Sequence, residues 1–290
     1  VARDFLGIKP LYYVFDKTGD LFYFVSEIKS IPNHILKNNN YIINQVPPGH
    51  YWSFNTKKFT EYYNLNNNEC TTHSTSPDSL TQIYNSINNI VTKSVIARFN
   101  ENSPFGILLS GGFDSCIITN IILEHVNTLQ NYDYSKLHIF TLGNVDGNDG
   151  DVTFAKKFVD SLESKYNVTL NHHIVYVDNI DLVVLTDKNI LDEIVYILET
   201  FDPCTIRNSI PYYYLFKYIK ENTNVKILLS GEGLQELCGN SNYNDLTENE
   251  YKTLNIKMLS NMCNFSLLKI DKMNKRMFTH KMHFHAEGVT

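Results

Sequence analysis

The feature that most constrains the fold of this chain is a set of short, continuous apolar runs. These runs occupy residues 105–109, 138–142, 172–177 and 225–229. A strand that is buried on both faces of a parallel sheet reads as such a run. The stretches between the runs have helical spacing, and this alternation is typical of a doubly wound α/β domain, here over residues 80–245. We expect helices at about 80–99, 114–126, 154–166, 188–200 and 210–221.

The first 65 residues follow a different pattern, which is typical of antiparallel strands. Aromatic runs at 11–15 and 21–25 flank a turn that contains Gly19, which predicts a hairpin. Further short strands are expected at 51–54 and 59–63. Residues 66–79 have few apolar side chains and many Asn and Thr, which indicates a linker between two domains.

Composition argues against several classes of function. The net charge is −6, whereas a nucleic-acid-binding face needs a basic excess. No apolar run approaches the roughly 18 residues that a membrane-spanning helix needs. The five cysteines are widely spaced and odd in number, and they form no zinc-type cluster, which indicates free thiols in a reducing compartment. We therefore expect a cytoplasmic protein that binds neither nucleic acid nor a membrane.

The strongest local motif is Ser-Gly-Gly-Phe-Asp-Ser at 110–115, between an expected strand and the next helix. Its glycines allow close backbone approach to an anion, and its N–H groups, its serine hydroxyls and the helix N-terminus favour phosphate oxygens. No Lys closes the loop, so it is not the GxxxxGK[ST] loop. Asp114 has two readings: it caps the helix, or it holds a Mg²⁺ that neutralises pyrophosphate.

The same strand-and-loop pattern occurs a second time. Ile-Leu-Leu-Ser-Gly at 107–111 is repeated at 227–231, and Glu232 follows the repeat. Because ligands bind at the carboxyl edge of an α/β sheet, both loops are expected to open at one site.

Ordered motifs along the chain carry a family resemblance. They include Val1-Ala2-Arg3-Asp4, the loop at 110–115, and Glu199-Thr200-Phe201-Asp202 with Thr205-Ile206-Arg207. Together they resemble the class B, glutamine-hydrolysing asparagine synthetases, with bacterial β-lactam synthetases as more distant relatives. Further matching stretches lie at 7–13, 26–30, 47–51, 59–63, 141–143, 151–155, 172–173 and 230–233.

The resemblance implies an α/β fold: a parallel-sheet, pyrophosphatase-loop synthetase domain of the adenine nucleotide α-hydrolase type at 80–290, truncated. It implies that residues 1–65 are the C-terminal remnant of an antiparallel glutaminase (amidotransferase type 2) domain, joined by a linker at 66–79. The implied activity is an ATP-dependent ligase that forms asparagine from aspartate through β-aspartyl-AMP. The implied partners are aspartate, ATP with Mg²⁺, and glutamine or ammonia, with a homodimer as an option.

The resemblance also assigns site residues. Glu232 and Arg207 would be catalytic, with Glu232 assisting ammonia attack, and Asp114 would hold the Mg²⁺. The ATP-binding residues would be Leu108, Ser110, Gly111, Gly112, Asp114, Ser115, Leu142, Gly143, Ser230 and Gly231. Arg207 has a second reading as a surface ion-pair partner of Glu199 or Asp202.

Three departures from the family pattern leave an alternative function open. Gln235 stands where the family has a Mg²⁺-binding Asp, and an amide is a poorer ligand. The N-terminal nucleophilic Cys of the family and its downstream catalytic Lys do not occur in this sequence, so we expect an incomplete or degraded chain. The alternative is a catalytically inactive nucleotide-binding or scaffold paralogue.

Smaller features favour structural roles. His172 and His173 are adjacent on a strand and should point to opposite faces, one buried and one exposed. The run Tyr212-Tyr213-Tyr214 indicates packing rather than base stacking. His280, His283 and His285 are expected in a disordered terminus rather than in a metal site.

Overall fold

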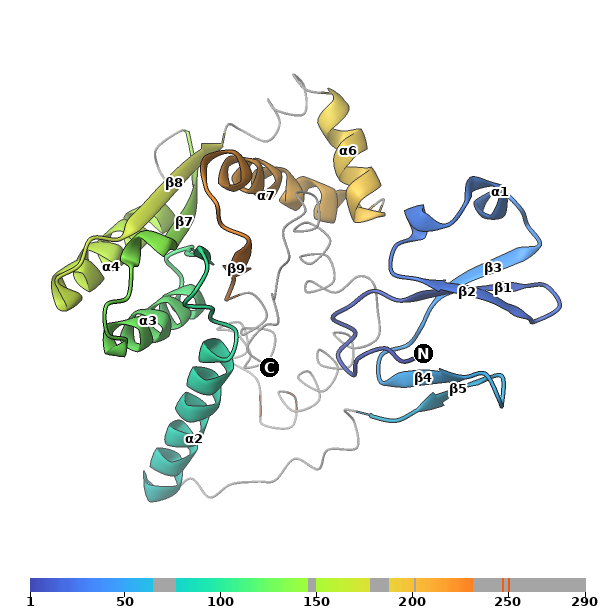
Figure 1. The fold of residues 1–290 in the computed structure, drawn as a ribbon, viewed down its shortest axis with the longest axis horizontal. Coiled ribbons are helices and arrows are strands. Elements are labelled where there is room, and N and C mark those ends of the chain that lie inside the picture. Colours follow the sequence, from blue (N-terminus) through green and yellow to red (C-terminus); the bar gives the residue numbers. More distant parts are fainter. Residues whose placement is uncertain are drawn as a thin grey trace.

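The computed structural model describes residues 1–64, 77–145, 150–177, 188–200 and 202–231, together with Thr247 and Glu250 (Figure 1). We call residues 1–64 the N-terminal unit and residues 77–231 the sheet unit. The expected linker at 66–79 falls mostly outside the described residues, as do Glu232, Gln235 and the His-rich end.

The sheet unit is built on a four-stranded parallel sheet in the order β8-β7-β6-β9. Its elements in chain order are α2 (Pro77–Ile96), β6 (Phe105–Leu108), α3 (Phe113–Thr128), the 3-10 helix η3 (Tyr134–Lys136), β7 (Leu137–Asn144), α4 (Gly150–Tyr166), β8 (Asn171–Val177), α6 (Lys188–Leu198), α7 (Pro203–Asn222) and β9 (Ile227–Leu229). The expected α/β fold with a parallel sheet is therefore confirmed.

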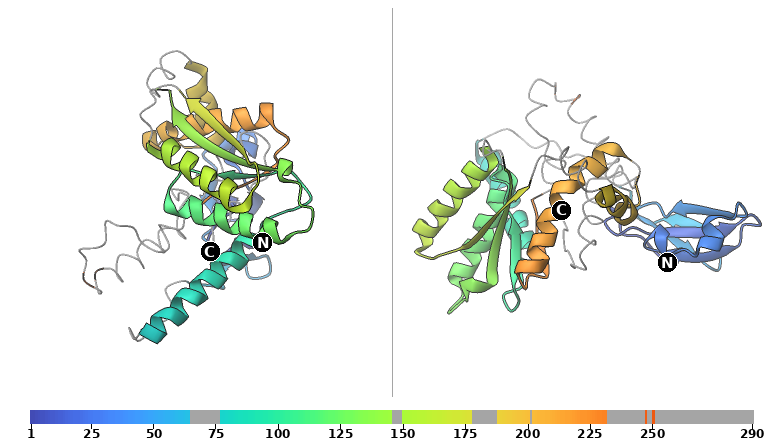
Figure 2. Two further views of the ribbon diagram at one scale, coloured as in Figure 1. Left: turned by 90° about the vertical axis from the view of Figure 1, so that its left-hand side faces the viewer. Right: turned by 90° about the horizontal axis from the view of Figure 1, so that it is seen from above.

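Apolar side chains on both faces of the sheet explain this layering. On one face, Ile107 and Ile139 join a core cluster with residues of α2, α3 and α4. On the other face, Phe140 and Leu228 pack with Phe216 and other residues of α7. Figure 2 shows α3 and α4 on one side of the sheet and α7 on the other. The central strands therefore need apolar residues toward both faces, as the continuous runs predicted.

The strand order creates a topological switch point beside β6. The chain runs from β6 to β7 to β8 in one direction, and β9 then pairs with the opposite edge of β6. At such a reversal, connections leave neighbouring strands toward opposite faces, and a crevice opens outside the carboxyl ends of the strands. The two Ser-Gly loops follow β6 and β9, so both lie at this switch point.

The N-terminal unit consists of antiparallel strands, as expected. One sheet has the order β2-β1-β3, and β4 pairs with β5 as a hairpin. The elements in chain order are β1 (Tyr12–Asp16), β2 (Leu21–Val25), the 3-10 helix η1 (Ile28–Ser30), α1 (Asn33–Leu36), β3 (Tyr41–Gln45), β4 (His50–Ser53) and β5 (Lys58–Glu61). Strand β3 is absent from the sequence prediction, because its half-buried pattern is less apolar than that of its neighbours.

A buried arginine fixes the start of the N-terminal unit. Arg3 is 3% exposed, and its guanidinium donates to the carbonyls of Lys9 at 3.1 Å, Val46 at 2.8 Å and Gly7 at 2.8 Å. A buried charge is tolerated only where hydrogen bonds replace water, and these carbonyls do so. Arg3 therefore connects the beginning of the chain to the end of β3.

Two helix boundaries differ from prediction for identifiable reasons. The helix expected from 210 begins at Pro203, because the Asp202 carboxylate accepts a hydrogen bond from the Thr205 N–H and Pro is favourable at the first helical position. Pro211 lies inside this helix. The helix expected to reach residue 200 ends at Leu198, because Glu199 adopts a positive φ of 52°.

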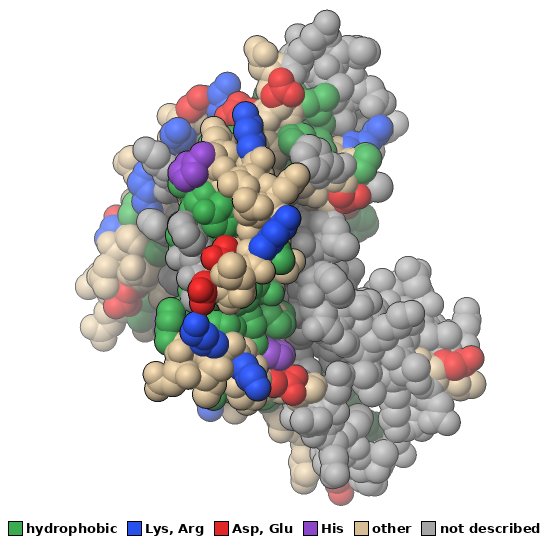
Figure 3. All heavy atoms as spheres, turned by 90° about the vertical axis from the view of Figure 1, so that its right-hand side faces the viewer, with side chains coloured by type: hydrophobic (Ala, Val, Ile, Leu, Met, Phe, Trp, Pro, Cys, Tyr) green, Lys and Arg blue, Asp and Glu red, His purple; other side chains and the backbone are tan. Residues whose placement is uncertain are grey.

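Figure 3 views the molecule from the side on which the N-terminal unit lies in Figure 1. Acidic and basic side chains are interspersed there among apolar ones on the described surface. Across the described ranges, no helix combines the length and apolar content required to cross a bilayer.

The first prediction concerns Gly106 in the centre of β6. An alanine Cβ there would meet the Leu228 side chain and would lie 2.9 Å from Phe140 Cε2 and 3.0 Å from Val225 Cγ1. We expect Gly106→Ala to lower the free energy of unfolding by about 1–3 kcal/mol, as overpacking does. The control is Gly150→Ala, where no described residue lies within 4 Å of the new Cβ. Urea unfolding followed by circular dichroism measures both, and equal stabilities would contradict the packing argument.

Candidate nucleotide site

The loop after β6 is braced by its own serines. The Ser110 N–H donates to Ser115 Oγ at 3.2 Å, the two hydroxyl oxygens lie 3.1 Å apart, and Ser115 Oγ donates to the Gly112 carbonyl at 3.0 Å. Ser115 is 5% exposed. The Ser115 hydroxyl therefore braces the loop from inside, and its expected contact with phosphate stays a prediction. Ser110 is exposed and Gly112 N–H donates to its Oγ at 3.3 Å.

Gly111 lets this loop approach helix α4. Its φ is +80°, and a Cβ at this position would lie 2.7 Å from the Asp151 carbonyl oxygen and 2.9 Å from the Ala155 backbone nitrogen. Only glycine combines that backbone conformation with so close an approach. The loop is therefore set against the first turns of α4.

The second Ser-Gly loop touches the first. A Cβ on Gly231 would lie 2.9 Å from the Ser115 backbone nitrogen and 3.1 Å from Asp114 Cβ. Ser230, which precedes Gly231, is 6% exposed. The prediction that the two loops meet at one edge of the sheet is confirmed, and glycine at 231 is what permits the contact.

Asp114 lies in the first turn of α3, directly beside this contact. Gly112 occupies the N-cap with φ −75° and ψ 164°, and as a glycine it makes no side-chain capping bond of its own. The alternative that Asp114 is the cap of this helix is therefore wrong. A carboxylate in a first turn is favoured by the helix dipole, and hard carboxylate oxygens are the ligands that Mg²⁺ prefers. The donor type at this position fits the expected metal.

Leu108 and Leu142 lie on the face of the sheet that packs on α7, opposite the face covered by α3. Leu108 is 9% exposed and belongs to the cluster that packs on α7, and Leu142 is half-buried against the same cluster. Gly143 follows in β7, where a Cβ would lie 2.7 Å from Val152 Cγ2 and 3.1 Å from the Tyr176 ring. These three residues border the carboxyl ends of β6 and β7, next to the first Ser-Gly loop.

Arg207 projects from the second turn of α7 and is exposed. The start of this helix is fixed by Asp202, whose carboxylate accepts from both the N–H and the hydroxyl of Thr205. The Asp202 carboxylate is thus engaged as a helix cap. One turn after Arg207, Pro211 has no N–H to donate to the Arg207 carbonyl.

The sequence prediction missed one buried polar bridge behind the site. Thr141 is fully buried in β7, and its hydroxyl donates to the Leu109 carbonyl at 2.8 Å and lies 2.8 Å from His172 Nε2. Leu109 directly precedes the first Ser-Gly loop. A threonine within a continuous apolar run was the available signal, because a buried hydroxyl needs a partner.

The two adjacent histidines do point to opposite faces. His172 contacts Thr141, whereas His173 Nε2 lies 3.1 Å from His138 Nδ1 and its Nδ1 lies 3.2 Å from the Tyr218 hydroxyl on α7. The expectation that one of them is exposed is wrong, because both are half-buried. Burial lowers the pKa of His138, His172 and His173, and neighbouring His173 adds to this effect on the other two. No group of three or more metal-ligating side chains occurs among the described residues.

The expected packing of the tyrosine run is confirmed. Tyr212 packs with the α7 cluster under the sheet, and Tyr213 and Tyr214 pack between α7 and α6. The Tyr213 hydroxyl also donates to the Glu193 carboxylate at 2.8 Å. Tyr213 and Tyr214 therefore connect α6 to α7.

The geometry first defines the class of the protein: a parallel α/β protein with two contacting glycine loops at the switch point of its sheet. The sequence matches the family described as asparagine synthase over residues 86–286. This chain belongs to the asparagine synthase family. Its relatives include a probable glutamine-hydrolysing asparagine synthetase of Dictyostelium discoideum, 31% identical over 279 residues, which are 93% of this chain and 46% of that protein.

Other relatives agree. A probable glutamine-hydrolysing asparagine synthetase of Acanthamoeba polyphaga mimivirus is 29% identical, over 93% of this chain and 48% of that protein. A glutamine-hydrolysing asparagine synthetase of Lotus japonicus is 30% identical, over 94% of this chain and 43% of that protein. The chain thus spans about half the length of the curated relatives it matches.

The second prediction concerns the pH dependence of stability. The three histidines have a lowered pKa in the folded state, so folding favours their neutral form. Their contribution to stability is full above the unfolded-state pKa of about 6.5 and is lost as pH falls through the folded-state values. We expect the unfolding midpoint temperature to fall between about pH 7.5 and pH 5, and His173→Gln to reduce that slope.

The matched control is His34→Gln, which changes an exposed histidine of the N-terminal unit and should leave the slope unchanged. Thermal unfolding of all three proteins across this pH range is the measurement. A slope in His173→Gln equal to that of the unsubstituted chain would refute the assignment.

Proposed function

We propose that this chain is the nucleotide-binding part of an ATP-dependent ligase that forms asparagine from aspartate through β-aspartyl-AMP. The observation that carries the proposal is the contact of Gly231 with Asp114 and Ser115, which brings two Ser-Gly loops together at the switch point. Adenylation of a carboxylate needs both an adenylate pocket and a site for the departing pyrophosphate. The nitrogen donor in this proposal is glutamine or ammonia.

The loop at 110–115 is the proposed pyrophosphate site. Its backbone N–H groups lie at the start of α3, where anions are favoured. Charge that develops on a leaving pyrophosphate would be stabilised there by preorganised donors. Asp114 is the residue that would hold Mg²⁺, and the ion would supply further neutralisation of pyrophosphate charge.

The adenylate is proposed to lie against Leu108, Leu142 and Gly143 on one side and Ser230 with Gly231 on the other. Leu108 and Leu142 supply apolar surface at the strand ends, which suits an adenine ring. Arg207 is proposed to bind the aspartate carboxylate, because a guanidinium can donate two parallel hydrogen bonds to it. Glu232, outside the described residues, is proposed to assist ammonia attack.

The proposed domain organisation follows the resemblance: residues 1–65 as the C-terminal part of a glutaminase domain, 66–79 as a linker and 80–290 as the synthetase domain. The antiparallel strands of the N-terminal unit are compatible with this division. We also propose a cytoplasmic protein with no nucleic-acid or membrane partner, and a homodimer as an option.

One observation favours a second candidate, a nucleotide-binding paralogue without ligase activity. Gln235, which also lies outside the described residues, is an amide where the family pattern has a Mg²⁺-binding carboxylate. Aspartate-dependent release of pyrophosphate from ATP separates the two candidates. The ligase releases it, whereas the inactive paralogue binds nucleotide and releases none.

The third prediction tests the metal role of Asp114. We expect Asp114→Ala to weaken Mg-ATP binding by roughly two orders of magnitude while AMP affinity changes less than about threefold, because only the metal–pyrophosphate contact is lost. Isothermal titration calorimetry with each ligand measures this. The matched control is Asp192→Asn, which changes an exposed carboxylate on α6. Equal losses for Mg-ATP and AMP would exclude a metal role.

The fourth prediction tests the contact between the loops. A Cβ in Gly231→Ala would press on the Ser115 amide and on Asp114. Because this displaces the adenylate and pyrophosphate sites together, AMP and Mg-ATP should both bind at least about tenfold more weakly. Calorimetry with both ligands gives the ratio. The control is Gly19→Ala, which strains a hairpin turn of the N-terminal unit at φ +88° but brings the new Cβ within 4 Å of no described residue. Loss of Mg-ATP binding alone would contradict the shared site.

A further inference from the structure

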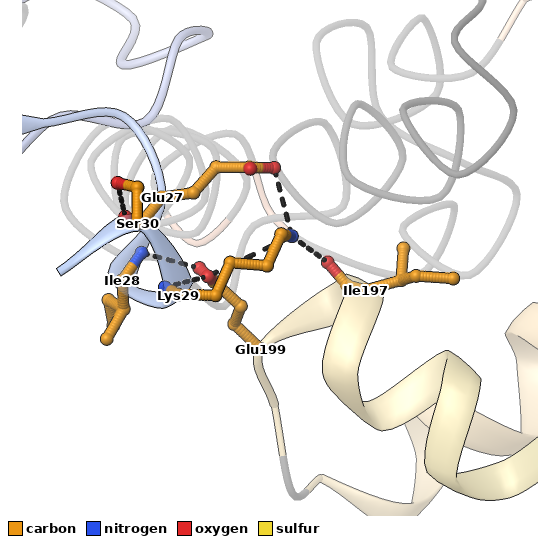
Figure 4. Close-up of polar contacts among 6 residues, drawn as sticks. All are labelled: Glu27, Ile28, Lys29, Ser30, Ile197 and Glu199. Carbon is orange, nitrogen blue, oxygen red and sulfur yellow. Dashed lines mark hydrogen bonds and ion pairs between the residues drawn. The ribbon is translucent and has the colours of Figure 1, made fainter. Parts of the chain in front are cut away.

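A buried carboxylate joins the two units of the molecule. Glu199 Oε1 accepts the Lys29 N–H at 2.7 Å, and Oε2 accepts the Ile28 N–H at 3.1 Å (Figure 4). The Glu199 side chain is 7% exposed. Ile28 and Lys29 belong to the N-terminal unit, whereas Glu199 directly follows α6 of the sheet unit. Both carboxylate oxygens are therefore used across the boundary between the units.

The local structure at 199 disfavours a glutamate. Glu199 has φ 52°, and its N–H donates to the Val195 carbonyl at 2.9 Å, which is the αL ending of a helix. Glycine is the usual residue at such a position, since side chains make φ > 0 costly. A negative charge at a helix C-terminus is also unfavourable. A residue that breaks local preferences in several ways at once indicates a constraint from outside its own helix.

Lys29 completes the contact from the other unit. Its ammonium donates to the Ile197 carbonyl at 3.2 Å and lies 3.1 Å from Glu27 and 3.9 Å from Glu199 (Figure 4). It also lies 5.5 Å from the centre of the Tyr196 ring. A cation next to the last carbonyls of α6 offsets the charge that Glu199 adds there.

Glu199 lies close in sequence to the residues that begin α7 and to Arg207. Asp202, three residues later, caps α7, and Arg207 lies in the second turn of that helix. In Figure 2, α6 and the start of α7 lie between the sheet and the N-terminal unit. Fixing Glu199 therefore fixes the entry into the segment 202–207.

We propose that Glu199 is a positioning residue: its carboxylate, bound to the Ile28 and Lys29 amides, ties the N-terminal unit to the segment 202–207 and so sets Arg207 for the substrate carboxylate. The last clause rests on the proposed function, and the coupling itself does not. Through this contact, the N-terminal unit affects the position of Arg207, the residue proposed to bind the aspartate carboxylate. The nucleotide end lies elsewhere, at the ends of β6 and β9.

Glu199→Gly is the informative variant, because glycine suits the αL conformation while the carboxylate is removed. Amide hydrogen exchange in the 290-residue chain should become at least about tenfold faster at Ile28 and Lys29. It should also become faster at Thr205, which donates to Asp202. The thermal midpoint of the sheet unit should not fall, which excludes simple misfolding.

Three further variants sharpen the test. Glu199→Gln keeps one acceptor oxygen and should give an intermediate exchange rate. Lys29→Met removes the ammonium but keeps the backbone N–H that Glu199 accepts, so protection at Ile28 should largely persist. Asp192→Asn is the control on α6 and should match the unsubstituted chain. Unchanged exchange at Ile28 and Lys29 in Glu199→Gly overturns the proposal, as does faster exchange there without any change at Thr205.

A ligand readout separates this inference from the proposed function. In Glu199→Gly the KM for aspartate in pyrophosphate release should rise about tenfold, while the Kd for Mg-ATP stays within about twofold. Loss of Mg-ATP affinity in this variant overturns the proposal, because Glu199 would then act on the nucleotide end. A chain that binds no Mg-ATP at all refutes the proposed function, and the exchange results then decide the interdomain coupling alone.

Discussion

The close approach of two glycines to the start of α3 is the constraint on which the rest of the site depends. Gly111 allows the first loop to sit against α4, and Gly231 allows the second loop to reach Asp114 and Ser115. A single Cβ at either position would occupy space already filled by backbone atoms, which unlike side-chain ends cannot move aside. The sheet must therefore present β6 and β9 as neighbours, and the order β8-β7-β6-β9 does so.

Buried polar groups transmit this constraint into the sheet. The Thr141 hydroxyl connects β7 to the Leu109 carbonyl, directly before the first loop, and His172 connects it to β8. Inside the loop, the Ser115 hydroxyl satisfies backbone groups that would otherwise need a ligand or water. The loop is thus shaped before any anion arrives, as preorganised electrostatic sites require.

The sheet and its loops could be predicted from the sequence because their signals are local. Continuous apolar runs identify buried parallel strands, and the repeated Ile-Leu-Leu-Ser-Gly marks two equivalent strand ends. The start of α7 and the cap of α3 were harder to predict, because several residues near each helix start could mark it. The start of α7 was expected at about residue 210, although Asp202 and Pro203 form an ordinary helix start. For Asp114 the sequence left two roles open, a helix cap and a Mg²⁺ ligand, and the helix boundary decides against the cap because Gly112 takes that place.

The Glu199 contact was beyond sequence reasoning for a different reason. The sequence predicted for Glu199 only an optional surface ion pair with Arg207, a residue close to it in the chain. The groups that donate to the Glu199 carboxylate are the backbone N–H groups of residues 28 and 29, which lie more than 160 positions away. A backbone N–H group is not specific to any residue type, so the sequence does not mark it. Any residue at those positions other than proline would donate equally well. Glu199 conflicts with its own local structure in three respects: its φ is positive, its charge lies at the unfavourable end of α6, and its side chain is 7% exposed. A conflict between local preference and observed residue is therefore the most informative signal that this chain offers about how its two units act on each other.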